Sequence, residues 1–91
     1  MAHISKNRDK ILARVRRIAG QVAAIERNVV SDASCSETLH LVAAVRGAVA
    51  GLMDELVVEH LHAHVAAPDL LPADRAEGAE ELATVLRRHF R

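Results

Sequence analysis

The chain has 91 residues, no formal net charge and a hydrophobic share of 51%, with one Phe and neither Trp nor Tyr. This length predicts a single domain over residues 1–91, which would bury only a modest part of its surface alone, so a second copy is expected. We find no apolar run of the roughly 18 residues that span a bilayer and no signal sequence, which predicts a soluble, cytoplasmic protein. A single cysteine, Cys35, excludes a disulfide-stapled secreted fold.

The first predicted helix covers residues 5–30. Its apolar positions advance by alternating steps of four and three residues, as on one helix face, and they are Ile11, Val15, Ile18, Val22, Ile25 and Val29. Turn-forming residues at Asn28, Ser31 and Asp32 end this helix. Ser34, followed three residues later by Glu37, forms a capping box that starts the next helix.

The second predicted helix runs without a breaker from residue 34 to about residue 64. Its main apolar stripe consists of Leu39, Val42, Val45, Val49, Leu52, Leu56 and Val57. Leu41, Val58 and Leu61 lie off that stripe, which predicts burial on two sides of the helix. A single chain of this length does not cover both sides, so the pattern also favours a dimer.

A linker with both prolines is predicted over residues 66–73. Asp74 and Glu77 form a second capping pair, which opens a short third helix with the apolar stripe Ala76, Ala79, Leu82, Leu86 and Phe90. The predicted fold is therefore all-α. Each chain has a long antiparallel helical hairpin and a short C-terminal helix, and two hairpins form a dimer that resembles a four-helix bundle.

The candidate metal ligands are a cysteine and several histidines. His60 and His64 are spaced i, i+4, so they project from one helix face and can hold one ion, whereas His62 points to the opposite side. Thiolate and imidazole together suit zinc, cobalt, nickel or copper. More often, however, two histidines at this spacing near a helix end are solvated or cap the helix and bind no metal. We expect no catalytic residues, because Glu59 is the one nearby base and so short a helical chain offers little cleft.

The distance between Cys35 and His60 predicts a site shared by two chains. The 25 residues between them on one straight helix span about 40 Å. In an antiparallel pair of identical helices, Cys35 comes opposite His60 or His64 of the second chain when the helices cross near residues 47–51. That run is Gly-Ala-Val-Ala-Gly, which allows close approach, although Gly47 and Gly51 could instead accommodate packing within one chain. If the first helix folds back on the second, His3 reaches residues 60–64 as a fourth ligand.

Residues 14–21 (RVRRIAGQ), Cys35, residues 43–53 (AAVRGAVAGLM) and His60 resemble the CsoR/RcnR/FrmR family of bacterial repressors. The resemblance implies a dimer of dimers that binds operator DNA and releases it when an inducer binds. The set His3, Cys35, His60 and His64 is similar to that of the nickel- and cobalt-sensing, RcnR-like branch.

Other branches of that family fit these residues less well. Copper and persulfide sensors need a second thiol, and formaldehyde sensors typically carry proline after Met1 and a residue other than histidine at the position of His64. This chain has Ala2 and His64 there. The resemblance therefore implies nickel or cobalt as inducer and leaves zinc open. Formaldehyde or another electrophile acting through Cys35 is the alternative.

A row of polar side chains on the first helix is the candidate DNA contact. Lys10, Arg14, Arg17 and Gln21 fall within a sector of roughly 60° beside the apolar stripe, where they can follow phosphates. Arg46 is either a further phosphate contact or part of an interface between chains. The row could instead be a basic face that only contacts solvent. For the whole protein, the alternative to a repressor is a metal-trafficking protein, which would not need such a basic row.

Overall fold

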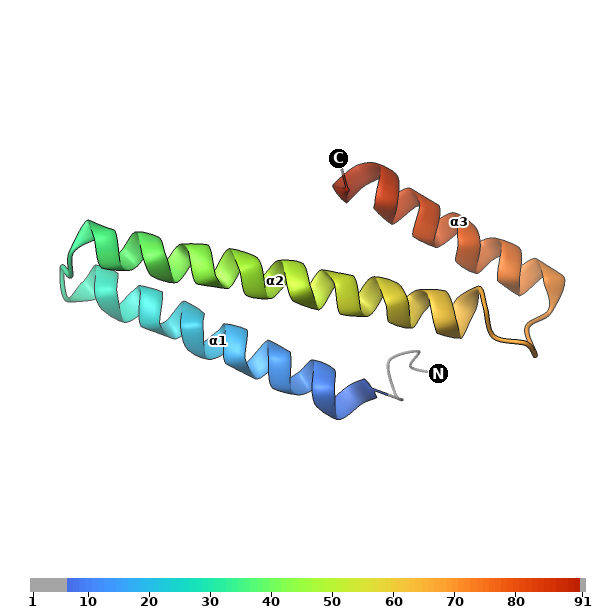
Figure 1. Ribbon diagram of the computed structural model, residues 1–91, viewed down its shortest axis with the longest axis horizontal. Helices are drawn as coiled ribbons and strands as arrows, with labels where there is room; N and C mark the ends of the chain where they lie inside the picture. The colour runs from blue at the N-terminus through green and yellow to red at the C-terminus, as the bar shows by residue number, and fades with distance from the viewer. Residues whose placement is uncertain (1–6, 91) are drawn as a thin grey trace. The chain divides into compact units, whose positions relative to one another are not determined.

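The computed structural model describes residues 7–90. It consists of three helices, α1 (Arg8–Val30), α2 (Cys35–His64) and α3 (Pro72–His89), shown in Figure 1. Within residues 7–90 there is no strand, which confirms the all-α prediction. None of the helices in this part of the chain is apolar over a length that would cross a membrane.

The chain divides into two compact units. We call residues 8–54 the hairpin unit, because α1 and the first part of α2 run in opposite directions there. The second, which we call the C-terminal unit, contains residue 7, the end of α2 and α3. Each unit is described by itself below.

The turn of the hairpin unit follows the predicted chemistry. Asp32 adopts a left-handed backbone conformation, with a φ of 58°, which aspartate tolerates better than most residues. The amide of Ala33 donates to the carbonyl of Asn28 at 2.9 Å, which satisfies one of the last carbonyls of α1. The backbone amide of Glu37 then donates to Ser34 Oγ at 3.2 Å, which confirms the side chain of Ser34 as the cap of α2. Among the described residues α1 begins at Arg8, and the predicted start at residue 5 lies outside them.

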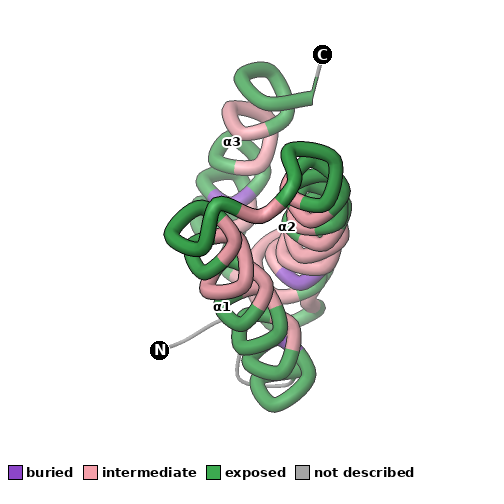
Figure 2. Tube along the Cα trace, turned by 90° about the vertical axis from the view of Figure 1, so that its left-hand side faces the viewer, coloured by how far each residue is buried: buried purple, intermediate pink, exposed green. Residues whose placement is uncertain are grey.

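The predicted apolar stripe of α1 is covered on one edge only. Ile11, with 5% of its surface exposed, is buried, and Ile18 and Ile25 are half-buried. Val15, Val22 and Val29 are exposed, although they belong to the same stripe, and Val29 shows 68% of its surface. Figure 2 shows how little of α1 and α2 is buried.

The covered face of α2 differs from the predicted main stripe. In the hairpin unit its half-buried positions recur at helical spacing and are Leu41, Val45, Ala48 and Leu52. The prediction places Leu41 off the main face and Val42 and Val49 on it, whereas both valines are 46% exposed. Val45 and Leu52 of the predicted stripe are therefore partly covered as expected, Val42 and Val49 are not, and burial on a second side of the helix stays a prediction. The helix is apolar nearly all round, so periodicity alone does not select the covered face.

The third helix begins before the predicted capping pair. α3 starts at Pro72, and Leu71 precedes it in an extended conformation with no side-chain cap. Proline is favoured at the first helical position because its missing N–H would have no helical partner there and its φ is already helical. Asp74 therefore lies in the first turn of α3 and is not its cap, and Pro72 does not belong to the linker.

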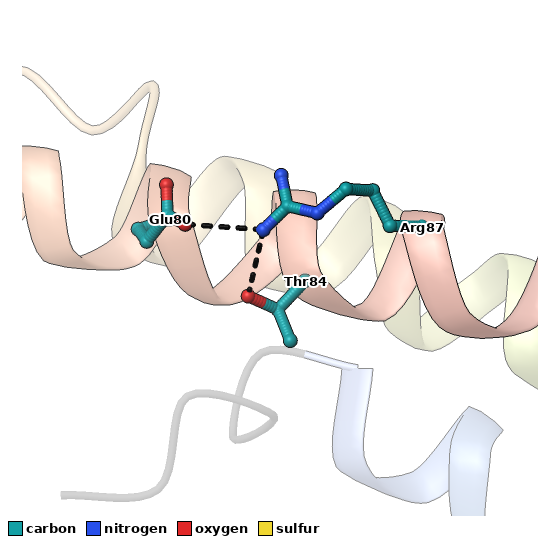
Figure 3. A network of polar contacts seen from close by, with 3 residues as sticks. All are labelled: Glu80, Thr84 and Arg87. Carbon is teal, nitrogen blue, oxygen red and sulfur yellow. Dashed lines mark hydrogen bonds and ion pairs between the residues drawn. The ribbon is translucent and has the colours of Figure 1, made fainter.

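The buried edge of α3 also differs from the prediction. Its covered positions include Arg75, Gly78, Leu82 and Val85, while Leu86 and Phe90 are exposed. On the exposed side, the Arg87 guanidinium donates to Glu80 Oε1 at 3.1 Å and to Thr84 Oγ1 at 3.3 Å (Figure 3). These contacts run along one helix and are open to solvent, so they contribute little to stability.

Candidate functional site

Two of the predicted ligands lie together at the end of α2. The rings of His60 and His64 are 4.8 Å apart between centroids and tilted by 41°. Both residues are half-buried, whereas His62 between them is exposed. The i, i+4 spacing therefore places His60 and His64 on one face, as the sequence predicts, and directs His62 elsewhere.

His60 is oriented by contacts with α3. Its Nε2 atom lies 3.0 Å from the backbone carbonyl oxygen of Gly78, at hydrogen-bond distance, and 3.8 Å from Glu81 Oε1. A ring nitrogen that donates to a carbonyl fixes the tautomer and the orientation of the imidazole. The contacts with Gly78 and Glu81 therefore hold the His60 ring in one orientation against α3.

Gly78 lets α3 approach this face closely. A Cβ atom at this position would lie 2.8 Å from His64 Cβ and 2.9 Å from His64 C, and closer still to the His64 carbonyl oxygen. Backbone atoms of a helix do not yield at such distances, so only glycine fits here. The close approach brings α3 against the last turn of α2, where both histidines lie.

The connection between α2 and α3 is fixed by one arginine. The half-buried Arg75 guanidinium donates to the carbonyls of Val65, Ala67 and Leu70, the last two at 3.0 and 3.4 Å. A single side chain thus satisfies three acceptors of the loop. The loop holds α3 at the turn that carries the histidines.

The remaining predicted ligands lie elsewhere or outside the described part. Cys35 is exposed and is the first residue of α2, while His60 and His64 belong to its other end. The continuous helix on which the distance argument depends is therefore present. His3 lies outside the described residues. Among residues 7–90, no three His, Cys, Asp or Glu side chains of one chain lie close enough to hold a metal ion.

The candidate DNA-contacting row is divided between two environments. Lys10 and Arg17 are exposed, as is Arg46 on α2, whereas Arg14 and Gln21 are half-buried. The Gln21 Oε1 atom is buried and has no hydrogen-bond partner among the described residues. The Lys10 and Arg17 side chains are thus exposed to solvent, whereas those of Arg14 and Gln21 are partly covered within the hairpin unit.

The two glycines of the small-residue run face different surroundings. A Cβ atom on Gly51 would lie 3.0 Å from the Arg14 guanidinium, so Gly51 makes room for a side chain of its own chain. A Cβ atom on Gly47 would meet no other atom within 4 Å. Gly51 therefore follows the alternative of packing within one chain, whereas Gly47 is exposed and packs against nothing else among the described residues of its own chain.

Sequence reasoning missed Gly78 and Glu81, which contact His60 from α3. They lie 18 and 21 residues further along the chain, and no local motif connects them to a histidine. The glycine inside a predicted helix was the available signal, since glycine in a helix interior often marks a close approach between backbones.

Three comparisons with known proteins bear on this site. A family model described as a metal-sensitive transcriptional repressor matches residues 7–88. An uncharacterised protein from the bioA 5′ region of Serratia marcescens is 46% identical over 91 residues, the whole length of both chains. The transcriptional repressor RcnR of Salmonella paratyphi B is 34% identical and covers 96% of this chain and 92% of its own.

A solved structure has the same fold. It is a glutamate-to-histidine variant of the formaldehyde-responsive regulator FrmR from Salmonella enterica serovar Typhimurium, with a TM-score of 0.84 and 44% identity. The match covers 90% of this chain and 92% of the FrmR chain.

Proposed function

The chain belongs to the family of metal-sensitive transcriptional repressors, and we propose that it binds operator DNA without metal and releases it on binding nickel or cobalt. In this proposal residues 1–91 form one repressor domain whose target encodes metal efflux. The observation that carries the proposal is the pair His60 and His64, held on one face of α2 with their rings 4.8 Å apart.

The proposed metal site joins residues of two chains. His60 and His64 would bind the ion with His3 of the same chain and Cys35 of a second copy. Imidazole and thiolate ligands fit nickel, cobalt and zinc better than magnesium or calcium, which prefer oxygen. This chain's part is to orient His60 through Gly78 and to keep both rings on one face.

A second copy would cover the open apolar side of the hairpin unit. The exposed apolar residues of that unit include Leu12, Val15, Val22, Val29, Leu39, Val42 and Val49. Leu39 is 64% exposed, and so many apolar side chains in one unit favour an interface over a solvated surface. We propose a homodimer built on this side, with two dimers forming a tetramer.

Release of DNA requires only that the metal bind one conformation better than the other. The metal-bound form would hold its basic side chains in an arrangement that fits DNA poorly, so binding of metal and of DNA would oppose each other. Lys10, Arg14, Arg17, Gln21 and Arg46 are the proposed DNA contacts. Because such contacts neutralise phosphates, affinity should fall steeply with salt.

The DNA contacts are tested with operator DNA at several salt concentrations. Arg17→Ala should weaken binding and reduce the slope of log affinity against log salt by about one for each phosphate that Arg17 neutralises in the wild type. The matched control is Arg88→Ala, which removes an exposed arginine of α3. Equal effects of the two variants would assign DNA binding to a different surface.

A formaldehyde-responsive repressor is the second candidate, and the FrmR neighbour at 44% identity favours it. In that case Cys35 would be modified covalently and His64 would not matter. The deciding experiment measures operator release by nickel, cobalt and formaldehyde on wild type, Cys35→Ala and His64→Ala. His62→Ala is the matched control, because His62 is exposed and directed away from the other two histidines.

The outcomes of that experiment separate the two candidates. Metal sensing predicts release by nickel or cobalt in wild type and His62→Ala, and none in Cys35→Ala or His64→Ala. Release by formaldehyde alone, with His64→Ala behaving as wild type, would overturn the metal assignment and leave the fold and the DNA contacts unchanged.

A further inference from the structure

One hydrogen bond connects the start of the described chain to the ligand end of α2. The side-chain amide of Asn7 donates to Glu59 Oε2 at 2.7 Å, across 52 residues of sequence. Glu59 is buried, with 5% of its surface exposed, whereas Asn7 is exposed. A buried carboxylate loses its hydration, so a hydrogen bond from outside its own helix stabilises it where it is.

The bond lies next to the proposed metal ligands. Glu59 directly precedes His60, and His64 follows one helical turn later on the same helix. Asn7 is four residues from His3, and four extended residues span at most about 14 Å. Chain length alone therefore keeps His3 within about 14 Å of Asn7, whose side chain is bonded to Glu59.

Restricting the start of the chain in this way changes the cost of metal binding. A ligand on a free terminal segment must be ordered when the ion binds, which lowers affinity. A ligand whose segment is already attached nearby acts at a high effective concentration. The Asn7–Glu59 bond would provide that attachment without touching the ion itself.

We propose that Asn7 and Glu59 are positioning residues that hold the N-terminal segment at the histidine end of α2 and thereby raise metal affinity through His3. The inference rests on the proposed function, in which His3 is a ligand. It assigns a role to a buried carboxylate that neither the metal ligands nor the DNA contacts account for.

Two other roles for these residues give different expectations. Asn7 directly precedes α1, where asparagine and serine both serve as helix caps. Asn7→Ser keeps that capacity but does not reach Glu59, so it separates capping from attachment. Glu59→Gln keeps an acceptor for the Asn7 amide but removes the charge, so it separates the hydrogen bond from general electrostatics.

The first experiment measures cobalt affinity by titration of the full chain. Asn7→Ala and Asn7→Ser should each weaken cobalt binding about tenfold, as removal of a residue that orients a ligand typically does, and Glu59→Gln should retain most of the affinity. In a His3→Ala background, Asn7→Ala should have no further effect. The matched control is Glu26→Gln, on an exposed glutamate of α1, which should bind as wild type.

The second experiment needs no metal. Trypsin cleaves after Lys6, and Glu59→Ala leaves the sequence around that bond unchanged. Cleavage after Lys6 should become several-fold faster in Glu59→Ala and stay near the wild-type rate in Glu59→Gln. Cleavage after Arg27, within α1, reports unfolding of the helix and should not change.

The outcomes distinguish failure of this inference from failure of the proposed function. Unchanged cleavage after Lys6 in Glu59→Ala would overturn the attachment itself, whatever the metal result. Equal loss of cobalt affinity on Asn7→Ala with and without His3 would show a general effect on the fold and also overturn the inference. Faster cleavage after Lys6 in Glu59→Ala would support the attachment by itself. If His3→Ala then bound cobalt as tightly as wild type, His3 would not be a ligand, which would contradict both this inference and the proposed metal site.

Discussion

The hairpin unit and the C-terminal unit differ in what holds them together. The hairpin unit leaves large apolar side chains such as Val22, Val29 and Leu39 exposed. The C-terminal unit is stabilised by polar contacts between its helices and its loop, including those of Arg75 with the loop and of His60 with Gly78. We infer that the hairpin unit is completed by assembly, whereas the C-terminal unit is already organised around its histidines.

The largest effect should come from a charge on the open side of the hairpin unit. Val49, 46% exposed and within the small-residue run, would be buried in the dimer, so Val49→Asp should raise the dimer dissociation constant at least about a hundredfold. Val30→Asp is the matched control, since Val30 is 81% exposed at the end of α1. Sedimentation at micromolar concentration measures both. A wild-type monomer, or a Val49→Asp dimer as stable as wild type, would contradict the interface.

The next effect concerns the close approach of α3 to α2. Gly78→Ala places a Cβ atom against the His64 backbone and should lower the free energy of unfolding by about 1–3 kcal/mol. Gly20→Ala is the matched control. A Cβ atom there meets nothing within 4 Å, so the helix should gain about 0.5–1 kcal/mol. Urea denaturation measures both, and equal stability of the two variants would mean that α3 does not pack as described.

A smaller effect is expected for the loop between α2 and α3. Arg75→Ala leaves three half-buried acceptors without their donor and should lower the free energy of unfolding by about 1.5 kcal/mol. Arg87→Ala removes an exposed ion pair with Glu80 and should cost less than about 0.5 kcal/mol. Thermal denaturation of the two variants gives the comparison, and an Arg87→Ala effect equal to that of Arg75→Ala would contradict it.

Helices and their ends were predictable where the signal is local. The Ser34 side-chain cap of α2 and the turn at Asp32 depend on residues a few positions apart, and both are present. The i, i+4 pairing of His60 and His64 is likewise a property of one helix. The predicted start of α3 is wrong because proline, which breaks the interior of a helix, is well suited to its first position.

Contacts between helices were not predictable in the same way. Leu41 and Val42 are both apolar, so the sequence does not indicate that Leu41 is half-buried and Val42 exposed. Gly51 and Gly47 look alike in the sequence, yet Gly51 accommodates Arg14 and Gly47 has open space around it. Glu81 meets His60 only because Gly78 brings α3 close. Each of these outcomes depends on packing over long sequence distances.

The central claim is that one metal site is built from two chains. It is tested by mixing Cys35→Ala chains with His64→Ala chains, each of which alone lacks a ligand in every site. In a mixed dimer, one site receives His64 from the Cys35→Ala chain and Cys35 from the His64→Ala chain, so all its ligands are present. The second site of the same dimer lacks both Cys35 and His64. Cys35→Ala alone lacks the sulfur-to-cobalt charge-transfer band, and His64→Ala alone binds cobalt more weakly and with an altered coordination geometry. Random mixing should therefore complete about a quarter of the sites and restore about a quarter of the wild-type cobalt absorption spectrum. Absence of that absorption from the mixture, with wild type showing it, would contradict a site shared between two chains.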